Sequence, residues 1–295
     1  MIYRIRHITQ YKYASPVSLA YNLACLLPRN TEYQTCLDHH LNITPTATAL
    51  AQRKDYFGNN THNFSLERAH TELIVDIQST VRVADVRLVG RDLEIGNAWE
   101  DSLLLMQSSK DEATLRAREF VLDSAFIKAH KELREYALPS FTNGRPLLSA
   151  VRDLTHRIFT DFTYDPGFTN VSTPLDEVLQ HRRGVCQDFA HLAIGCLRSM
   201  GFAARYISGY LETIPPPGQE KLVGADASHA WFSVFSPTEG WFEFDPTNDN
   251  IPGPQHITTA WGRDYADVSP LKGVIFEGGG SQSLLVSVDV QRLEA

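Results

Sequence analysis

Residues 182–202, RRGVCQDFAHLAIGCLRSMGF, place a cysteine directly after a Gly-Val pair and at the start of an apolar-periodic run. The periodicity predicts an amphipathic helix that begins at Cys186 and ends at Gly201. Cys186 then has two interpretations. It can be a small apolar side chain of the core, or a thiol held where unpaired N–H groups and the helix dipole favour a thiolate. Cys196, in the middle of the same helix, is expected in the core. The residues that form the apolar stripe are Phe189, Ala190, Ala193, Ile194, Leu197 and Met200.

A second stretch, residues 228–249, reads SHAWFSVFSPTEGWFEFDPTND and predicts a β-hairpin that turns over residues 236–240. If Phe235 faces Trp241, then His229 lies diagonally across from Asp245 on the same face. A slip of one residue would put the two on opposite faces. A carboxylate beside one ring nitrogen fixes the tautomer, and the other nitrogen can then serve a thiol as base and a leaving amine as acid.

The chain divides into two parts by pattern. Residues 1–105 contain short alternating runs with turn signals at 55–60, which predict a β-rich N-terminal domain. Residues 106–295 predict an α+β domain in which helices are followed by antiparallel strands. The final strand, 283–293, can return to a sheet. Helical periodicity is present in 111–137, 145–162, 172–183 and 186–200.

Composition excludes several classes of function. The 295 residues carry a net charge of −8 without a basic cluster, which argues against nucleic acid and anionic membranes as partners. No apolar run approaches membrane-spanning length, and the N-terminal alternation differs from a signal peptide. The four cysteines form no CxxC pair, which fits a reducing compartment. We therefore expect a soluble, cytoplasmic protein.

Three motifs resemble the transglutaminase-like domain, which has a papain-like cysteine fold: GVCQDFAHLAIGCLRSMGFAARYISGYL, SHAWFSVF and WFEFDPTND. The N-terminal YRIRHITQYKYASPVSLAYNL, LLPRN and DYFGNN are similar to the β-rich region of the bacterial members. GRDYADVSP and LLVSVDVQRL resemble their C-terminal end. The resemblance implies a core of helices packed on an antiparallel sheet, preceded by a β-rich domain. It also implies that Cys186 is the nucleophile, His229 the general base and acid, and Asp245 the residue that orients the imidazole.

The oxyanion hole is less defined by the sequence. The backbone N–H of Cys186 is the expected first donor. The second donor should come from near residues 161–169, where Tyr164 is the candidate, and Gln187 is the alternative. Animal relatives place a tryptophan indole in this role, but no tryptophan lies between residues 100 and 230 of this chain.

Other polar residues allow more than one interpretation. A metal held by Cys186, His191 and His229 is disfavoured, because residues five apart on a helix do not face one another and paired zinc spacing is absent. With no acidic calcium loop either, no metal and no cofactor are expected. Asp264, Tyr265 and Asp267 can line a cleft or form a buried polar staple. The loop 212–228 can be a lid over the site or a plain solvent loop.

These observations predict acyl transfer through a thioester on Cys186, at a peptide, isopeptide or glutamine-type amide of a peptide or protein substrate. Water as second substrate gives a hydrolase, and an amine gives a transferase. The alternative is a catalytically silent binding or scaffold protein that retains the fold. A thiol acetyltransferase ranks below both, because the sequence offers no phosphate-binding loop or basic cluster for coenzyme A.

Overall fold

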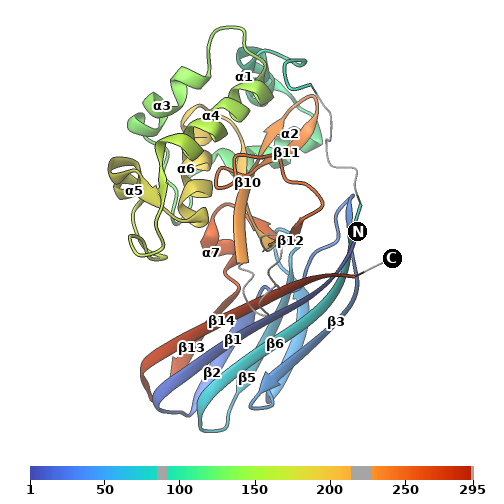
Figure 1. Ribbon diagram of the computed structural model, residues 1–295, viewed down its shortest axis with the longest axis vertical. Coiled ribbons are helices and arrows are strands. Elements are labelled where there is room, and N and C mark those ends of the chain that lie inside the picture. Colours follow the sequence, from blue (N-terminus) through green and yellow to red (C-terminus); the bar gives the residue numbers. More distant parts are fainter. Residues whose placement is uncertain (85–91, 214–227, 294–295) are drawn as a thin grey trace, which may run out of the picture.

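A computed structural model of the chain describes residues 1–84, 92–213 and 228–293. Figure 1 shows two parts: long strands that form a β-sandwich, and a group of helices around a smaller sheet. Both parts agree with an α+β fold in which a β-rich region precedes a papain-like core. Among the described residues, no helix combines the length and the apolar composition needed to cross a membrane.

The sandwich consists of two four-stranded antiparallel sheets, with strand orders β14-β1-β6-β3 and β13-β2-β5-β4. Alternation in β1 puts Tyr3 and Ile5 inside and Arg4 and Arg6 outside, as expected for strands with one buried face. Side chains from both sheets share one apolar core. The strands are β1 (Ile2–Val17), β2 (Leu19–Ala24), β3 (Gln34–Thr44), β4 (Ala49–Lys54), β5 (Asn60–Leu66), β6 (His70–Val83), β13 (Leu271–Phe276) and β14 (Gly279–Leu293).

The second part has a sheet of order β11-β10-β9-β12, which α6 covers on one face. A two-strand parallel pair, β7 and β8, lies beside the start of α6. The strands are β7 (Thr163–Tyr164), β8 (Arg183–Gly184), β9 (Ala204–Leu211), β10 (Ser228–Ser236), β11 (Gly240–Phe244) and β12 (His256–Gly262). The helices are α1 (Trp99–Ser108), α2 (Glu112–Ala117), α3 (Lys131–Ala137), α4 (Leu147–Asp161), α5 (Leu175–His181), α6 (Cys186–Ser199) and α7 (Tyr265–Val268), with 3-10 turns η1 (Arg118–Val121) and η2 (Leu138–Ser140).

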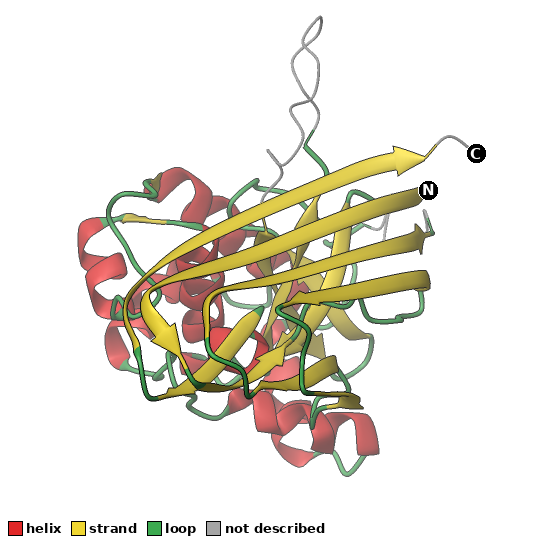
Figure 2. Ribbon diagram, turned by 90° about the horizontal axis from the view of Figure 1, so that it is seen from below, coloured by secondary structure: helices red, strands yellow, loops and turns green. Residues whose placement is uncertain are grey.

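The structure differs from the domain boundary that the sequence predicts at residue 105. Residues 99–105 are helical rather than β, because they belong to α1, whose segment WEDSLLLMQS has no β-branched residue and starts with acidic side chains. The last strand does return to a sheet, but to the sandwich: β14 pairs with β1 from Ile2↔Leu293 onward, and β13 pairs with β2. Residues 271–293 therefore belong to the N-terminal sandwich. Figure 2 shows these long strands side by side, and the start of β1 pairs with the end of β14.

The prediction of a single helix over residues 111–137 is also wrong. The segment breaks into α2, η1 and α3, because a turn at 123–129 uses local bonds: Ser124 N–H donates to Ile127 O, and the Asp123 carboxylate accepts from Ala129 N–H. Such side-chain bonds to the backbone compete with a helix. The helices predicted at 145–162, 172–183 and 186–200 are present as α4, α5 and α6.

The two parts meet at β12, the edge strand of the smaller sheet. Two buried amides of the sandwich take the place of a neighbouring strand there. Gln34 binds both N–H and C=O of Thr258, at 2.9 and 2.7 Å, and Asn59 does the same for Trp261, at 2.9 and 2.8 Å. An apolar cluster that includes Tyr3, Tyr210 and Ile257 lies beside these contacts. The backbone groups of Thr258 and Trp261 at this edge of the sheet are therefore hydrogen-bonded, and the edge is covered.

Candidate active site

Cys186 is the first residue of α6, and its surroundings fix the start of that helix. Val185 is extended and its N–H donates to the Asp188 carboxylate at 2.8 Å, while the Thr169 hydroxyl donates to the same oxygen at 2.7 Å. A carboxylate three residues into a helix supplies such a bond back to the cap. Gly184 is required for close packing, because an added Cβ would lie 2.8 Å from the Asp188 side chain. The thiol is therefore held at a helix N-terminus.

The two cysteines of this helix differ as the sequence predicts. Cys186 is partly exposed, whereas Cys196 is fully buried in the apolar core. Burial raises the pKa of the Cys196 thiol well above its ordinary range. Only Cys186 of the two is accessible to a substrate.

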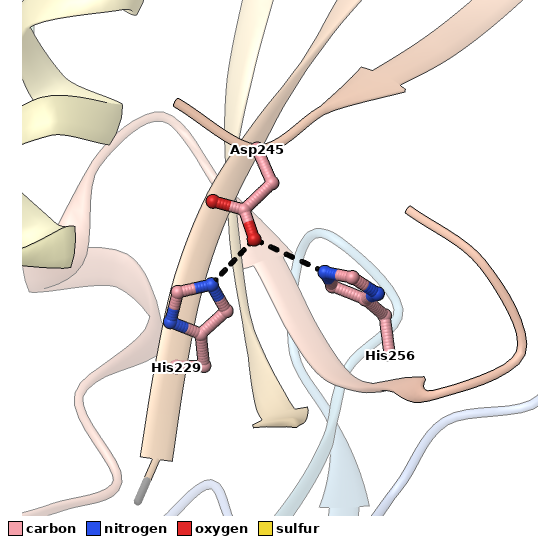
Figure 3. Close-up of side chains that lie close together, drawn as sticks. All are labelled: His229, Asp245 and His256. Carbon is pink, nitrogen blue, oxygen red and sulfur yellow. Dashed lines mark hydrogen bonds and ion pairs between the residues drawn. The ribbon is translucent and has the colours of Figure 1, made fainter. Parts of the chain in front are cut away.

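The β10–β11 hairpin has the register that the sequence predicts. Phe235 pairs with Trp241 and Phe232 pairs with Phe244. This register places His229 and Asp245 on one face, where His229 Nε2 lies 2.7 Å from Asp245 Oδ2 (Figure 3). The expected imidazole–carboxylate pair is thus formed.

The Asp245 carboxylate is fully buried and receives several hydrogen bonds. Its Oδ1 accepts the backbone N–H groups of Thr247 and Asn248, and its Oδ2 accepts from His229, from the Asn248 amide at 2.7 Å and from His256 at 3.1 Å. Burial alone would raise its pKa, but the bonds from His229 and His256 outweigh burial and hold the pKa well below its usual range. Asp245 is therefore ionised at neutral pH.

His229 lies between this carboxylate and the thiol. Burial lowers the pKa of its ring, but the hydrogen bonds and charges of Asp245 and Cys186 outweigh burial and raise the pKa to about 10. Because Asp245 occupies Nε2, Nδ1 is the ring nitrogen left for the hydrogen bond with Cys186. The three residues form one connected line in which an imidazolium can face a thiolate.

His256, the first residue of β12, was not predicted from the sequence. Its Nε2 contacts Asp245 Oδ2, and its Nδ1 accepts the N–H of Gly253 at 3.3 Å. An accepting Nδ1 leaves the ring proton on Nε2, so His256 is a neutral donor to the carboxylate. The only sequence signal is a histidine at the head of a short apolar run, and nothing local links that run to Asp245.

The cluster of His229, Asp245 and His256 also has the residue types of a metal site, with ligand atoms within 4.8 Å of one another. A metal on His256 Nε2 would require the proton on Nδ1, where it would meet the Gly253 N–H. The donor set therefore fits a hydrogen-bonded network better than a metal. His191, weighed as a ligand beside Cys186, instead accepts the Tyr265 N–H at 3.1 Å, and burial lowers its pKa to about 4.

The two candidates for the second oxyanion donor are Tyr164 and Gln187. Tyr164 is in β7, next to Gly184 of β8, and burial followed by the charge of Cys186 raises the pKa of its phenol. Its side chain is about half exposed. The Gln187 amide donates to Val171 O at 3.5 Å, so its N–H is engaged by a backbone carbonyl. The position of Tyr164 fits a donor better, and the role of either residue stays a prediction.

The segment GRDYADVSP forms the polar staple rather than a cleft wall. Asp264 is buried and accepts the N–H groups of Phe126 and Ala266, and Asp267 pairs with Arg263 at 2.9 Å. The bond from Phe126 ties the segment between β12 and α7 to the turn that precedes α3, and the other two bonds are local to the segment. Of the lid candidate 212–228, residues 214–227 lie outside the described residues.

Comparisons with known proteins agree with this arrangement. Residues 3–82 match the bacterial transglutaminase-like N-terminal region, and residues 135–246 match the transglutaminase-like superfamily. An uncharacterized protein of Mycobacterium tuberculosis is 41% identical over 99% of this chain and 93% of its own length, and one of Mycobacterium leprae is 34% identical over 98% of both.

One solved structure has the same fold throughout. A protein from Cytophaga hutchinsonii, described as a candidate cysteine protease, superposes with a TM-score of 0.76 at 23% identity, over 100% of this chain and 91% of its own. A protein-glutamine gamma-glutamyltransferase of Pseudomonas aeruginosa is 32% identical over 31% of this chain and 14% of its own length. The chain belongs to the transglutaminase-like superfamily, with the N-terminal region of its bacterial members.

Proposed function

We propose that this protein is a cysteine-dependent amidase or acyltransferase that acts on a peptide, isopeptide or glutamine-type amide of a peptide or protein. The observation that carries the proposal is the position of His229, which bonds Asp245 at 2.7 Å through Nε2 and serves Cys186 through its other nitrogen. A buried imidazolium between a carboxylate and an accessible thiol has the arrangement of an activated nucleophile.

In the first half of the reaction, the Cys186 thiolate attacks the amide carbonyl carbon and the carbonyl electron pair moves to oxygen. The Cys186 N–H at the start of α6 donates to this oxyanion, and Tyr164 is our candidate for the second donor. The oxyanion collapses, the C–N bond breaks, and His229 gives its Nδ1 proton to the leaving amine. A thioester on Cys186 and a neutral His229 remain.

In the second half, neutral His229 removes a proton from water or from an amine that attacks the thioester. The C–S bond breaks and the thiolate of Cys186 is restored beside a protonated His229. Asp245 stays ionised throughout, because its donors hold its pKa low. The similarity to a protein-glutamine gamma-glutamyltransferase over part of the chain supports an amide as the bond attacked.

The test is turnover of a library of peptides and isopeptides, with and without an added primary amine, by wild type, Cys186→Ala and His229→Gln. The proposal predicts that both substitutions abolish release of ammonia or amine. A Cys186→Ala protein with wild-type turnover would overturn the mechanism. A folded wild type whose Cys186 titrates in alkylation like a free thiol would favour the scaffold alternative.

A further inference from the structure

We propose that His256 is a positioning residue for the Asp245 carboxylate, and that Gln34 of the N-terminal sandwich determines where His256 lies. The inference rests on the proposed function, because it concerns the residue that orients the general base. It also gives the sandwich a role in the reaction, although no strand of the sandwich carries a residue of the Cys186–His229–Asp245 line.

His256 is built as a fixed donor. Its ring is buried, its Nδ1 accepts the Gly253 N–H, and its Nε2–H therefore points to Asp245 Oδ2 at 3.1 Å. The rings of His256 and Trp231 pack in a T-shaped arrangement, with ring centroids 5.2 Å apart, which limits rotation of the imidazole. His256 needs no change of protonation to hold the carboxylate.

The bond from His256 acts on the same oxygen that His229 uses (Figure 3). The other side-chain donor to Oδ2, Asn248, lies in the turn that follows Asp245, so it moves with the carboxylate. His256 comes from a different strand, β12, so its bond fixes the position of Asp245 Oδ2 relative to a part of the protein outside the hairpin. Without it, Oδ2 can turn away from His229, and the imidazolium loses alignment with Cys186.

The position of His256 depends on the sandwich. β12 is an edge strand, bonded on one side to β9. Its other side is bound by the side chains of Gln34 and Asn59 and by the backbone N–H of Arg29, which donates to Thr258 O at 3.3 Å. Gln34 is buried and fixes Thr258 by two bonds, and its amide also donates to Arg29 O at 2.7 Å. Thr258 lies two residues after His256, so a shift of Thr258 along the strand shifts the imidazole as well.

The test compares His256→Leu, His256→Gln and Gln34→Leu with Arg292→Gln. The last variant is the matched control, because Arg292 pairs with Glu212 at 2.5 Å between the same two parts, and the hydrogen bonds that the structure describes for its side chain go to Glu212 and Tyr3. The readout is the rate of Cys186 alkylation by iodoacetamide at pH 6 divided by the rate at pH 8, together with the melting temperature. A purely structural role would lower the melting temperature without changing this ratio.

We expect His256→Leu to lower the ratio about tenfold, as for loss of one hydrogen bond to a charged group. His256→Gln keeps a hydrogen-bond donor, so its ratio should lie between those of His256→Leu and wild type. Gln34→Leu should also lower the ratio. Arg292→Gln should leave it unchanged. The double variant His256→Leu/Gln34→Leu should be no worse than His256→Leu, because both act through one contact.

The outcomes separate this inference from the proposed function. If the wild-type ratio is that of a free thiol, the proposed function fails. If wild type has the high ratio and Asp245→Asn loses it, but His256→Leu and His256→Gln both keep it, then the function stands and the role of His256 is refuted. If Gln34→Leu behaves like Arg292→Gln, the role of the sandwich is refuted. If His256→Leu does not fold, the ratio of His256→Gln tests the role of His256 and the ratio of Gln34→Leu tests the role of the sandwich.

Discussion

Replacing Asp245 with asparagine removes the negative charge beside His229 and keeps the size of the side chain. In the native protein, burial lowers the pKa of His229, and the contacts with Asp245 and Cys186 raise it from 6.5 to about 10. That difference corresponds to about 5 kcal/mol in favour of the charged ring. Without the Asp245 charge, burial dominates and the imidazolium is no longer stable at neutral pH. The asparagine amide can also favour the wrong tautomer.

The assay is iodoacetamide alkylation of Cys186 as a function of pH. In wild type, an imidazolium that persists to about pH 10 keeps the thiolate present, so the rates at pH 6 and pH 8 should agree within about twofold. In Asp245→Asn that imidazolium is lost, so the rate should fall steeply from pH 8 to pH 6, by up to roughly 80-fold, which is the change for a thiol with the unperturbed pKa of about 8.5. The ratio within one protein cancels differences in intrinsic nucleophilicity.

The assay must report on Cys186 alone, so the other three cysteines must not contribute to the measured rate. Burial raises the pKa of Cys25 to about 12 and raises the pKa of Cys196 further, so neither reacts in this range. Cys36 is half-buried and is replaced by serine in all proteins compared. A wild-type rate that falls as steeply as that of Asp245→Asn would refute the reasoning, because the His229 imidazolium would then not stabilise a thiolate.

Three further predictions concern the framework of the site. Gly209→Ala should lower the unfolding free energy by more than about 2 kcal/mol, because the added Cβ would lie 2.2 Å from Ile257 O and 2.5 Å from Trp231. The measurement is urea unfolding, and the control is Gly253→Ala, where an added Cβ meets open space. Asp188→Ala should cost about 1 kcal/mol through loss of the bond from Val185 N–H, and an unchanged melting temperature would contradict this. Because folding raises the pKa of His229, its contribution to stability is complete below pH 6.5 and is lost as pH rises to about 10. The unfolding free energy of wild type minus that of His229→Gln should therefore shrink between pH 7 and 10, and a difference that grows would refute the assignment.

The features that the sequence predicts correctly are local. The start of α6 at Cys186 follows from the apolar periodicity, and its end follows from Gly201. The hairpin register follows from a short turn that links Phe235 to Trp241. In both cases, the residues that decide the structure lie within a few positions of one another. Side-chain alternation then determines which residues share a face, so His229 and Asp245 could be placed together before any tertiary contact was known.

What could not be predicted depends on contacts between distant segments. β14 joins the sandwich because β1, at the other end of the chain, offers it an edge, and no pattern in residues 279–293 identifies that partner. His256 reaches Asp245 only because β12 pairs with β9 and is held by Gln34 from the sandwich. Such pairings between distant segments are a property of the whole fold, and one-dimensional periodicity contains no information on them.

The central claim is that Cys186 forms a thioester with the acyl part of an amide substrate. The direct measurement is intact-protein and peptide mass spectrometry of acid-quenched reactions with glutamine-containing and isopeptide-containing peptides. We predict an adduct of the peptide less its leaving amine on Cys186, removed by hydroxylamine and absent from Cys186→Ala. Turnover of these peptides with no adduct on Cys186, at a rate that Cys186→Ala retains, would contradict the claim.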